Sequence, residues 1–144
     1  MTVPAEYQRA RDDFYAFLLD ARDRSGLWST HVTYTMVQGV FQVFRRRLTV
    51  HDSIAFANTL RACLRALYIV NWDTEQEPVP FADIATLNAE VRSLRADHNF
   101  STENAIQVIA ATLQNHVDQI AFKKMLKTLS PEAQLFWLNQ EKPT

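Results

Sequence analysis

Apolar residues recur at intervals of three and four along most of this chain, with polar residues between them. This spacing places the apolar side chains on one face of an α-helix. The first such stretch covers about residues 5–24 and follows Pro4, whose missing N–H suits the first turn of a helix. Gly26 comes soon after it, and we expect this glycine to end the helix in the left-handed conformation. The pattern therefore predicts an amphipathic first helix.

Two further helices are predicted at about residues 31–47 and 50–69, where the same apolar spacing continues. The hydroxyl of Thr49 can cap the second of these, and Asp52 three residues later gives a loose form of the capping box. No proline interrupts residues 50–69, so we expect a single unbroken helix there.

Residues 70–81 form the one long break in the pattern. Two prolines and three acidic residues lie in this segment, and a proline inside a helix removes a hydrogen bond and clashes with the preceding turn. We expect a linker loop here, followed by a bridging helix at about residues 82–97.

Three shorter helices are predicted in the last third of the chain. Ser101 is expected to cap the first of them, and the second covers about residues 118–129. Ser130 and Pro131 suit the cap and first position of a short last helix, after which residues 139–144 are expected to fray.

The apolar pattern also repeats at an offset of 69 positions, so that residues 37–68 match residues 106–137 without a gap. A repeat of this kind is typical of duplicated helical units. We therefore predict a single all-α domain, a bundle of six to seven helices with an internal two-fold repeat of helix pairs. Its first repeat spans about residues 30–69 and its second about residues 100–138.

Composition agrees with a packed helical domain. Apolar residues make up 47% of the 144 residues, and only two residues are glycine, fewer than the turns of a β-rich domain would need. The net charge of −1 excludes a general electrostatic case for nucleic-acid binding. No window is apolar enough to span a bilayer, and no export signal is visible. We therefore expect no membrane association and a cytoplasmic location.

Residues that could carry catalysis or hold a metal are sparse. The four histidines form none of the pairs that place two ligands on one helix face. We interpret His51 and His116 as residues at a helix start and a helix end, and Cys63, the single cysteine, as a small core residue. No metal, cofactor or catalytic residue is predicted, although spacing alone cannot reveal a site built from distant helices.

Charge is unevenly distributed along the chain. Residues 30–68 carry a net charge of +4, mainly from Arg45, Arg46 and Arg47, whereas residues 73–103 carry −5. The two regions either face solvent or each other, or they make a dipolar molecule that docks on itself or on a charged partner.

Several short phrases resemble the DUF2267 family. Leu64-Arg65-Ala66-Leu67-Tyr68, followed by Trp72-Asp73, is similar to the L-R-x-L-Y and G-W ending of that family's first repeat. Arg47-Leu48-Thr49 resembles the phrase before its third helix, and Leu129-Ser130-Pro131-Glu132 resembles the L-P-x-E-L phrase of its second repeat.

The resemblance covers about residues 12–138, with two departures. Asn71 stands where a glycine is usual, and Arg61-Ala62 stands where a proline is expected. The resemblance implies an all-helical two-repeat bundle of bacterial origin. It implies no reaction, because the family is itself defined by unknown function.

We expect a non-enzymatic interaction or scaffold protein that associates with itself or with a protein partner. The alternative is a small-ligand-binding bundle with a pocket between the two repeats, near Tyr68, Trp72 and Trp137. Trp72 would be either a structural plug between the repeats or an exposed anchor on a partner surface. The residues expected to contact a partner or ligand are Tyr68, Trp72, Asp73, Trp137, Arg45, Arg46 and Arg47.

Overall fold

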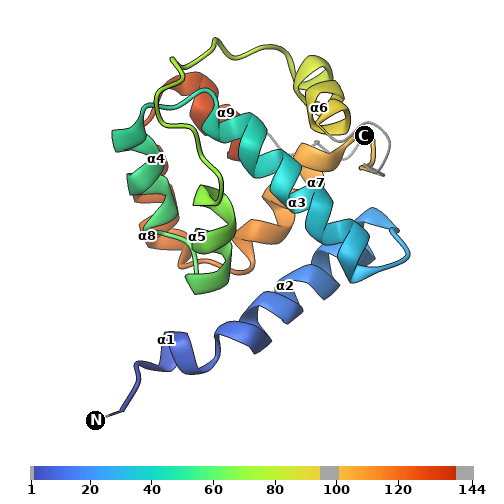
Figure 1. Cartoon of the computed structure of the whole chain (residues 1–144), viewed down its shortest axis with the longest axis vertical. Coiled ribbons are helices and arrows are strands. Elements are labelled where there is room, and N and C mark those ends of the chain that lie inside the picture. The colour runs from blue at the N-terminus through green and yellow to red at the C-terminus, as the bar shows by residue number, and fades with distance from the viewer. Residues whose placement is uncertain (1, 95–100, 139–144) are drawn as a thin grey trace.

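The computed structural model describes residues 2–94 and 101–138, and every regular element within these ranges is an α-helix (Figure 1). The prediction of an all-α fold is confirmed. The helices are α1 (Ala5–Gln8), α2 (Ala10–Ser25), α3 (Thr30–Arg45), α4 (Val50–Ala57), α5 (Ala62–Ile69), α6 (Ile84–Ser93), α7 (Ala105–Gln114), α8 (Gln119–Leu126) and α9 (Pro131–Leu138).

Helix α3 lies at the centre of the molecule and packs against α2, α5, α6 and α7 (Figure 1). Helix α2 also contacts α5 and α7, so it closes one side of the bundle. Helices α4 and α8 pack against each other away from α2, and α9 contacts α7. The short α1 contacts α2 at the N-terminal end of the chain.

The described part of the chain contains nine helices, so the prediction of six to seven is wrong. The expected first helix is interrupted at Arg9, where φ is −100° and ψ is 6°. The expected helix over residues 50–69 is divided into α4 and α5. The apolar periodicity of the sequence continues across both interruptions, so this pattern does not reveal them.

The break between α4 and α5 has a local cause. The backbone N–H of Thr59 and that of Leu60 donate to carbonyls three residues earlier, and the Thr59 hydroxyl also donates to the Phe56 carbonyl at 2.7 Å. Such side-chain bonds compete with helix continuation. Arg61 is then extended, with φ −67° and ψ 161°, and α5 starts in a new direction.

Several helix boundaries agree with the sequence-based prediction. Thr49 caps α4 by accepting a hydrogen bond from the Asp52 N–H at 3.1 Å, and Ser130 accepts one from Ala133 N–H at 3.2 Å in the first turn of α9. Gly26 ends α2 with φ +74°, a conformation that costs glycine little. The expected fraying of residues 139–144 lies outside the described residues.

The expected cap at Ser101 is wrong, because α7 begins only at Ala105. Asn104 precedes it and makes no side-chain cap bond. Instead Asn88 of α6, which is 3% exposed, accepts a hydrogen bond from the Ile106 N–H at 2.9 Å. Its amide nitrogen donates to Gln107 Oε1 at 2.9 Å. A neighbouring helix therefore satisfies a free N–H at the start of α7.

Helix α6 itself is capped by Asp83, whose carboxylate accepts a hydrogen bond from Thr86 N–H at 2.7 Å. It begins near the predicted start of the bridging helix and ends at Ser93. Residues 95–97, which were also expected in this helix, lie outside the described residues.

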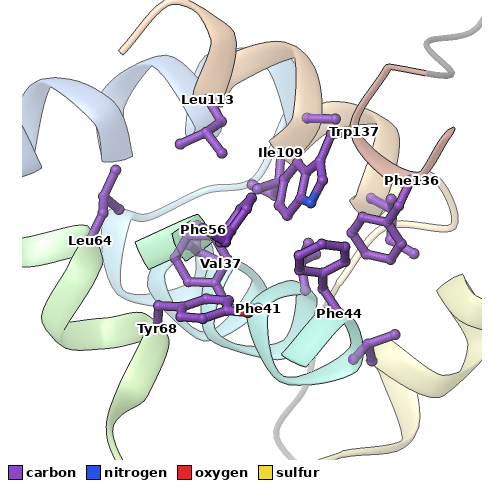
Figure 2. Close-up of a cluster of buried hydrophobic side chains, with 14 of the residues drawn as sticks. Val37, Phe41, Phe44, Phe56, Leu64, Tyr68, Ile109, Leu113, Phe136 and Trp137 are labelled. Carbon is purple, nitrogen blue, oxygen red and sulfur yellow. The ribbon is translucent and has the colours of Figure 1, made fainter. Parts of the chain in front are cut away.

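A cluster of aromatic side chains from α3, α4, α5, α8 and α9 lies within a core that is otherwise mainly aliphatic (Figure 2). Trp137 is fully buried and stacks on Phe56, with ring centroids 5.1 Å apart. The ring centroid of Phe44 lies 4.9 Å from that of Phe56 and also 4.9 Å from that of Phe136. Full burial of each such side chain contributes about 1.5–3 kcal/mol relative to exposure. The cluster therefore joins helices from both ends of the chain.

The indole N–H of Trp137 has no hydrogen-bond partner among the described residues. The ring of Phe44 stands at 79° to the indole with centroids 5.2 Å apart, and Phe136 stands at 61° and 5.0 Å. Aromatic faces are weak acceptors for such an N–H group.

Helix α2 is fixed to the C-terminal end of α7 by a polar contact beside an aromatic one. His116 Nε2 lies 3.0 Å from Asp20 Oδ2, and its ring packs on Phe17 at 5.4 Å. Arg24 donates to Asp20 Oδ1 at 2.9 Å. Burial alone would raise the pKa of the Asp20 carboxyl, but the hydrogen bonds from His116 and Arg24 outweigh it and leave this pKa below its ordinary value.

We predict that Asn88→Ala lowers the free energy of unfolding by about 1–3 kcal/mol, because it leaves the buried Ile106 N–H without an acceptor. Urea unfolding followed by circular dichroism measures this. Asn58→Ala, an exposed asparagine at the end of α4, is the matched control and should change stability by less than about 0.5 kcal/mol. Equal effects of the two variants would contradict the assigned role of Asn88.

We also predict that Asp20→Asn makes stability less dependent on acid pH. The folded-state pKa of Asp20 lies below its ordinary value of 3.8, so its stabilisation is present above that value and is lost as the pH falls through the folded-state pKa. The difference in urea midpoint between wild type and Asp20→Asn should therefore shrink between pH 6 and pH 3, values that bracket the ordinary carboxyl pKa of about 3.9. A difference that stays constant would count against this contact.

Candidate functional site

A long segment without helix, residues 70–83, connects α5 to α6 and passes over the C-terminal end of α3 (Figure 1). It walls an open hollow of about 810 Å³, which we call the loop hollow. Arg45 and Arg46 of α3, Trp72 and Asp73 of the segment, and Glu90 of α6 contribute to its lining. Four of the seven residues expected to contact a partner are thus brought together here.

The segment begins with a left-handed residue. Asn71 has φ +56°, a conformation that asparagine adopts more readily than most non-glycine residues. This explains how asparagine replaces the glycine usual at this position in the family that the sequence resembles. Arg45 Nη1 donates to the carbonyls of Tyr68 at 2.7 Å and Val70 at 3.2 Å, which satisfies acceptors left free at the end of α5.

The two following arginines hold the rest of the segment. Arg46 Nη1 lies 2.6 Å from Glu90 Oε1, and Arg47 Nη2 lies 2.7 Å from Glu90 Oε2. Arg47 Nε also donates to the Pro80 carbonyl at 3.1 Å, and the Val79 N–H donates to the Arg46 carbonyl at 3.0 Å. The end of α3 is therefore tied to both the segment and α6.

The sequence left open whether the basic and acidic regions face solvent, each other or a partner, and the contacts of Arg46 and Arg47 bear on this question. The basic and acidic regions face each other through Glu90, which the sequence pattern did not single out. The Arg47 side chain is only 6% exposed, so it is not available as a surface cation. The acidic composition of residues 73–103 is the only sequence signal for a partner of the arginines, and it does not specify which acid.

Three carboxylates on the segment remain at the edge of the loop hollow, and we call Asp73, Glu75 and Glu77 the acidic rim. All three residues are exposed. Asp73 Oδ1 accepts a hydrogen bond from the Glu75 N–H at 3.1 Å. Within residues 2–94 and 101–138, no basic side chain lies within 4.0 Å of these carboxylates. The rim therefore presents uncompensated negative charge.

Arg45 differs from the other two arginines because it is 8% exposed and has no carboxylate partner among the described residues. Its guanidinium lies 5.5 Å from the centre of the Trp72 ring, a cation–π contact. Burial lowers the pKa of Arg45, Tyr68 opposes this shift, and the neighbouring charge of Arg46 adds to it. Trp72 is half-buried by this packing.

The structure places Tyr68 and Trp137 in the core rather than at the loop hollow. Both are 0% exposed. The Tyr68 hydroxyl lies 2.9 Å from Ser53 Oγ, and burial raises the pKa of this phenol, so it stays neutral. Neither side chain can contact a partner directly without unpacking the core. The aromatic trio expected to line one pocket is therefore not assembled, since Trp72 alone reaches the loop hollow.

Among the residues that the structure describes, the remaining histidines and Cys63 do not form a recognisable catalytic group. Cys63 is half-buried rather than fully in the core, and it shares a hollow of about 10 Å³ with His116. No hydrogen bond joins these two side chains in the described structure, and His116 Nε2 is held by Asp20. His51 lies in the first turn of α4 and is exposed. Outside the undescribed residues, no three His, Cys, Asp or Glu side chains are grouped as metal ligands.

Within the described ranges, no helix is both long and apolar enough to cross a bilayer.

Comparison with known proteins gives one finding beyond the geometry. Among curated proteins, none is significantly similar to this chain. A family model described as an uncharacterized conserved protein, DUF2267, matches residues 14–136, which is most of the chain and includes the segment that forms the loop hollow. The chain therefore belongs to the DUF2267 family.

Proposed function

We propose that this protein is a non-enzymatic interaction protein and that the loop hollow is its binding surface. The observation that carries the proposal is the construction of residues 70–83. A connection of this length without secondary structure is uncommon in a compact domain and usually serves a function. Here Arg45 donates to the Val70 carbonyl, Arg47 donates to the Pro80 carbonyl, and the Arg46 carbonyl accepts from the Val79 N–H, so three consecutive arginines hold the segment in place.

The acidic rim indicates the charge of the partner. Asp73, Glu75 and Glu77 carry three negative charges that form no ion pair in the described structure, and they line a concave surface together with Arg45 and Arg46. Complementary charge at an interface accelerates association and selects between partners. We therefore expect a partner that presents lysine or arginine side chains.

A second copy of this chain offers such a surface, which supports self-association. Lys123, Lys124 and Lys127 are exposed at α8 and make no ion pair among the described residues. Ile120 on the same helix is 83% exposed and would add apolar contact. We call these four residues the lysine face. A contact between the acidic rim of one copy and the lysine face of another is head-to-tail, and it can form rings or chains.

The spacing of helix ends supports the inference of a duplicated architecture. Helices α4 and α8 begin and end 69 positions apart, and so do α5 and α9. The C-terminal ends of α3 and α7 differ by the same number. We therefore infer a repeated unit of three helices rather than the helix pair expected from the sequence. The segment at residues 70–83 lies between the two units, so the loop hollow is built next to the end of the first unit.

A small molecule is the second candidate occupant. The volume of about 810 Å³ lies within the range of about 300–1,000 Å³ common for ligand sites. Such sites are mostly apolar, however, whereas charged and amide side chains supply much of this wall. A charged protein segment suits this lining better.

We predict that the protein self-associates at micromolar concentration, with a mean mass that falls as salt is added, because exposed charges are screened. Size-exclusion chromatography with light scattering measures this. Glu75→Lys with Glu77→Lys should abolish the association. The control with the same charge change is Glu103→Lys with Glu132→Lys, two exposed acids that do not line the loop hollow, and it should associate like wild type.

A charge exchange makes the same test specific for the lysine face. The rim variant should associate again when it is mixed with Lys123→Glu and Lys124→Glu in a second chain, because opposite charges are restored across the contact. A protein that stays monomeric at several hundred micromolar, well above the concentrations of typical stable complexes, would refute self-association.

A further inference from the structure

We propose that the floor of the loop hollow binds a carboxylate through Arg45, and that the ligand is the free C-terminal end of a lysine-rich peptide. This inference rests on the proposed function, since it places a ligand of the expected positive charge at the same surface, where it would compete with the lysine face of a second copy. It assigns the two ends of the ligand separately: the carboxylate to Arg45 and the lysine side chains to the acidic rim.

The guanidinium of Arg45 is anchored at one nitrogen and available at the others. Nη1 donates to the carbonyls of Tyr68 and Val70, whereas Nε and Nη2 have no hydrogen-bond partner among the described residues. Both nitrogens retain some solvent accessibility, since the only fully buried side-chain nitrogen or oxygen without a partner among the described residues is Trp137 Nε1. The Nε and Nη2 edge of arginine is suited to two parallel hydrogen bonds with a carboxylate.

The same side chain is a buried positive charge without a counterion. Arg45 is 8% exposed, and no carboxylate lies within 4.0 Å of it in the described ranges. The carboxylate of Glu90, which also lines the hollow, is occupied by Arg46 and Arg47. Buried charges in proteins are normally paired, because desolvation of an unpaired ion is costly. A ligand carboxylate would supply the missing partner.

Trp72 restricts the direction from which a ligand can approach. Its ring lies against the guanidinium at 5.5 Å, which covers one face and leaves the edge of the group for hydrogen bonding. Gln42 and Asn71 also line the hollow and bring amide groups that can donate to the same anion.

The acidic rim decides which anions fit. Asp73, Glu75 and Glu77 would repel a simple anion, and they would repel a doubly charged phosphate about twice as strongly as a carboxylate. A ligand that carries lysine side chains next to its carboxylate turns this repulsion into attraction. The end of a peptide chain with lysines before the last residue has this arrangement of charge.

The test compares two synthetic peptides, acetyl-Lys-Lys-Ala with a free carboxylate and the same peptide with a C-terminal amide, by isothermal titration calorimetry on the full chain. We expect the free acid to bind at least about tenfold more tightly, the size of effect expected for a charge-assisted hydrogen-bond pair. Inorganic phosphate alone should bind more weakly than the free acid. Equal affinities of the two peptides, tighter binding of phosphate, or no binding of either peptide at millimolar concentration would overturn the inference.

Substitutions test whether Arg45 causes the preference for the peptide with a free carboxylate. Arg45→Gln should remove the preference for the free acid, whereas Arg11→Gln, which changes an exposed arginine of α2 that does not line the loop hollow, should retain it. Glu75→Gln with Glu77→Gln should weaken both peptides while keeping their ratio. A folded Arg45→Gln protein that retains the preference would overturn the assignment. If Arg45→Gln does not fold, two results still test the carboxylate site. The peptide must lose affinity when its carboxylate is amidated, and the ratio of the two affinities must be the same in the rim variant as in wild type.

This experiment separates the inference from the proposed function. Peptides that bind without a preference for the free acid would remove the carboxylate subsite but leave the charged interaction surface. Self-association is measured independently by mass, so its failure would refute that proposal while the peptide affinities would still report on Arg45.

Discussion

The C-terminal end of α3 concentrates three guanidinium groups, and the surface above it depends on where each of them donates. Arg45 binds the carbonyls at the end of α5, while Arg46 and Arg47 bind the carboxylate of Glu90 on α6. A negative helix end favours cations in its last turn, so the charges are also stabilised by the helix that carries them. Without these contacts, residues 70–83 would be held mainly by Phe81, whose ring centroid lies 6.3 Å from that of Phe44 and 6.5 Å from that of Phe136, and by the half-buried Trp72.

The three arginines at the end of α3 lie next to a core whose buried side chains cannot contact a partner. Trp137, Phe56 and Phe44 fill the space between helices from both halves of the chain, and their rings are fully buried (Figure 2). Close-packed aromatic rings resist rearrangement, because each loses contacts with several others when one moves. The core therefore provides a rigid base, and the chemistry available to a partner lies in the polar segment above it.

Sequence reasoning was most successful where a single element decides the outcome. The left-handed end of α2 at Gly26 and the cap of α4 at Thr49 depend on residues within one turn of the helix end. It failed where a residue elsewhere in the chain takes part. Asn88 replaces the expected cap at Ser101, and Trp137 is a core residue rather than a contact residue. Of the candidate site, the sequence indicated Arg45, Arg46, Trp72 and Asp73, but not Glu90, which orients two of the arginines.

The sequence by itself determined the helical class, because the period of apolar residues decides which faces must be buried. It also determined that residues 70–81 cannot continue a helix, since two prolines lie there, whereas residues 82 and 83 were expected to belong to the next helix. Only the tertiary structure decided that this segment folds back over α3, that two of the three arginines pair with the same glutamate, and that Arg45 is buried without a carboxylate partner in the described ranges. The physical reason is that charge pairing depends on distances between helices, and these distances are set by the packing of the core rather than by any local pattern.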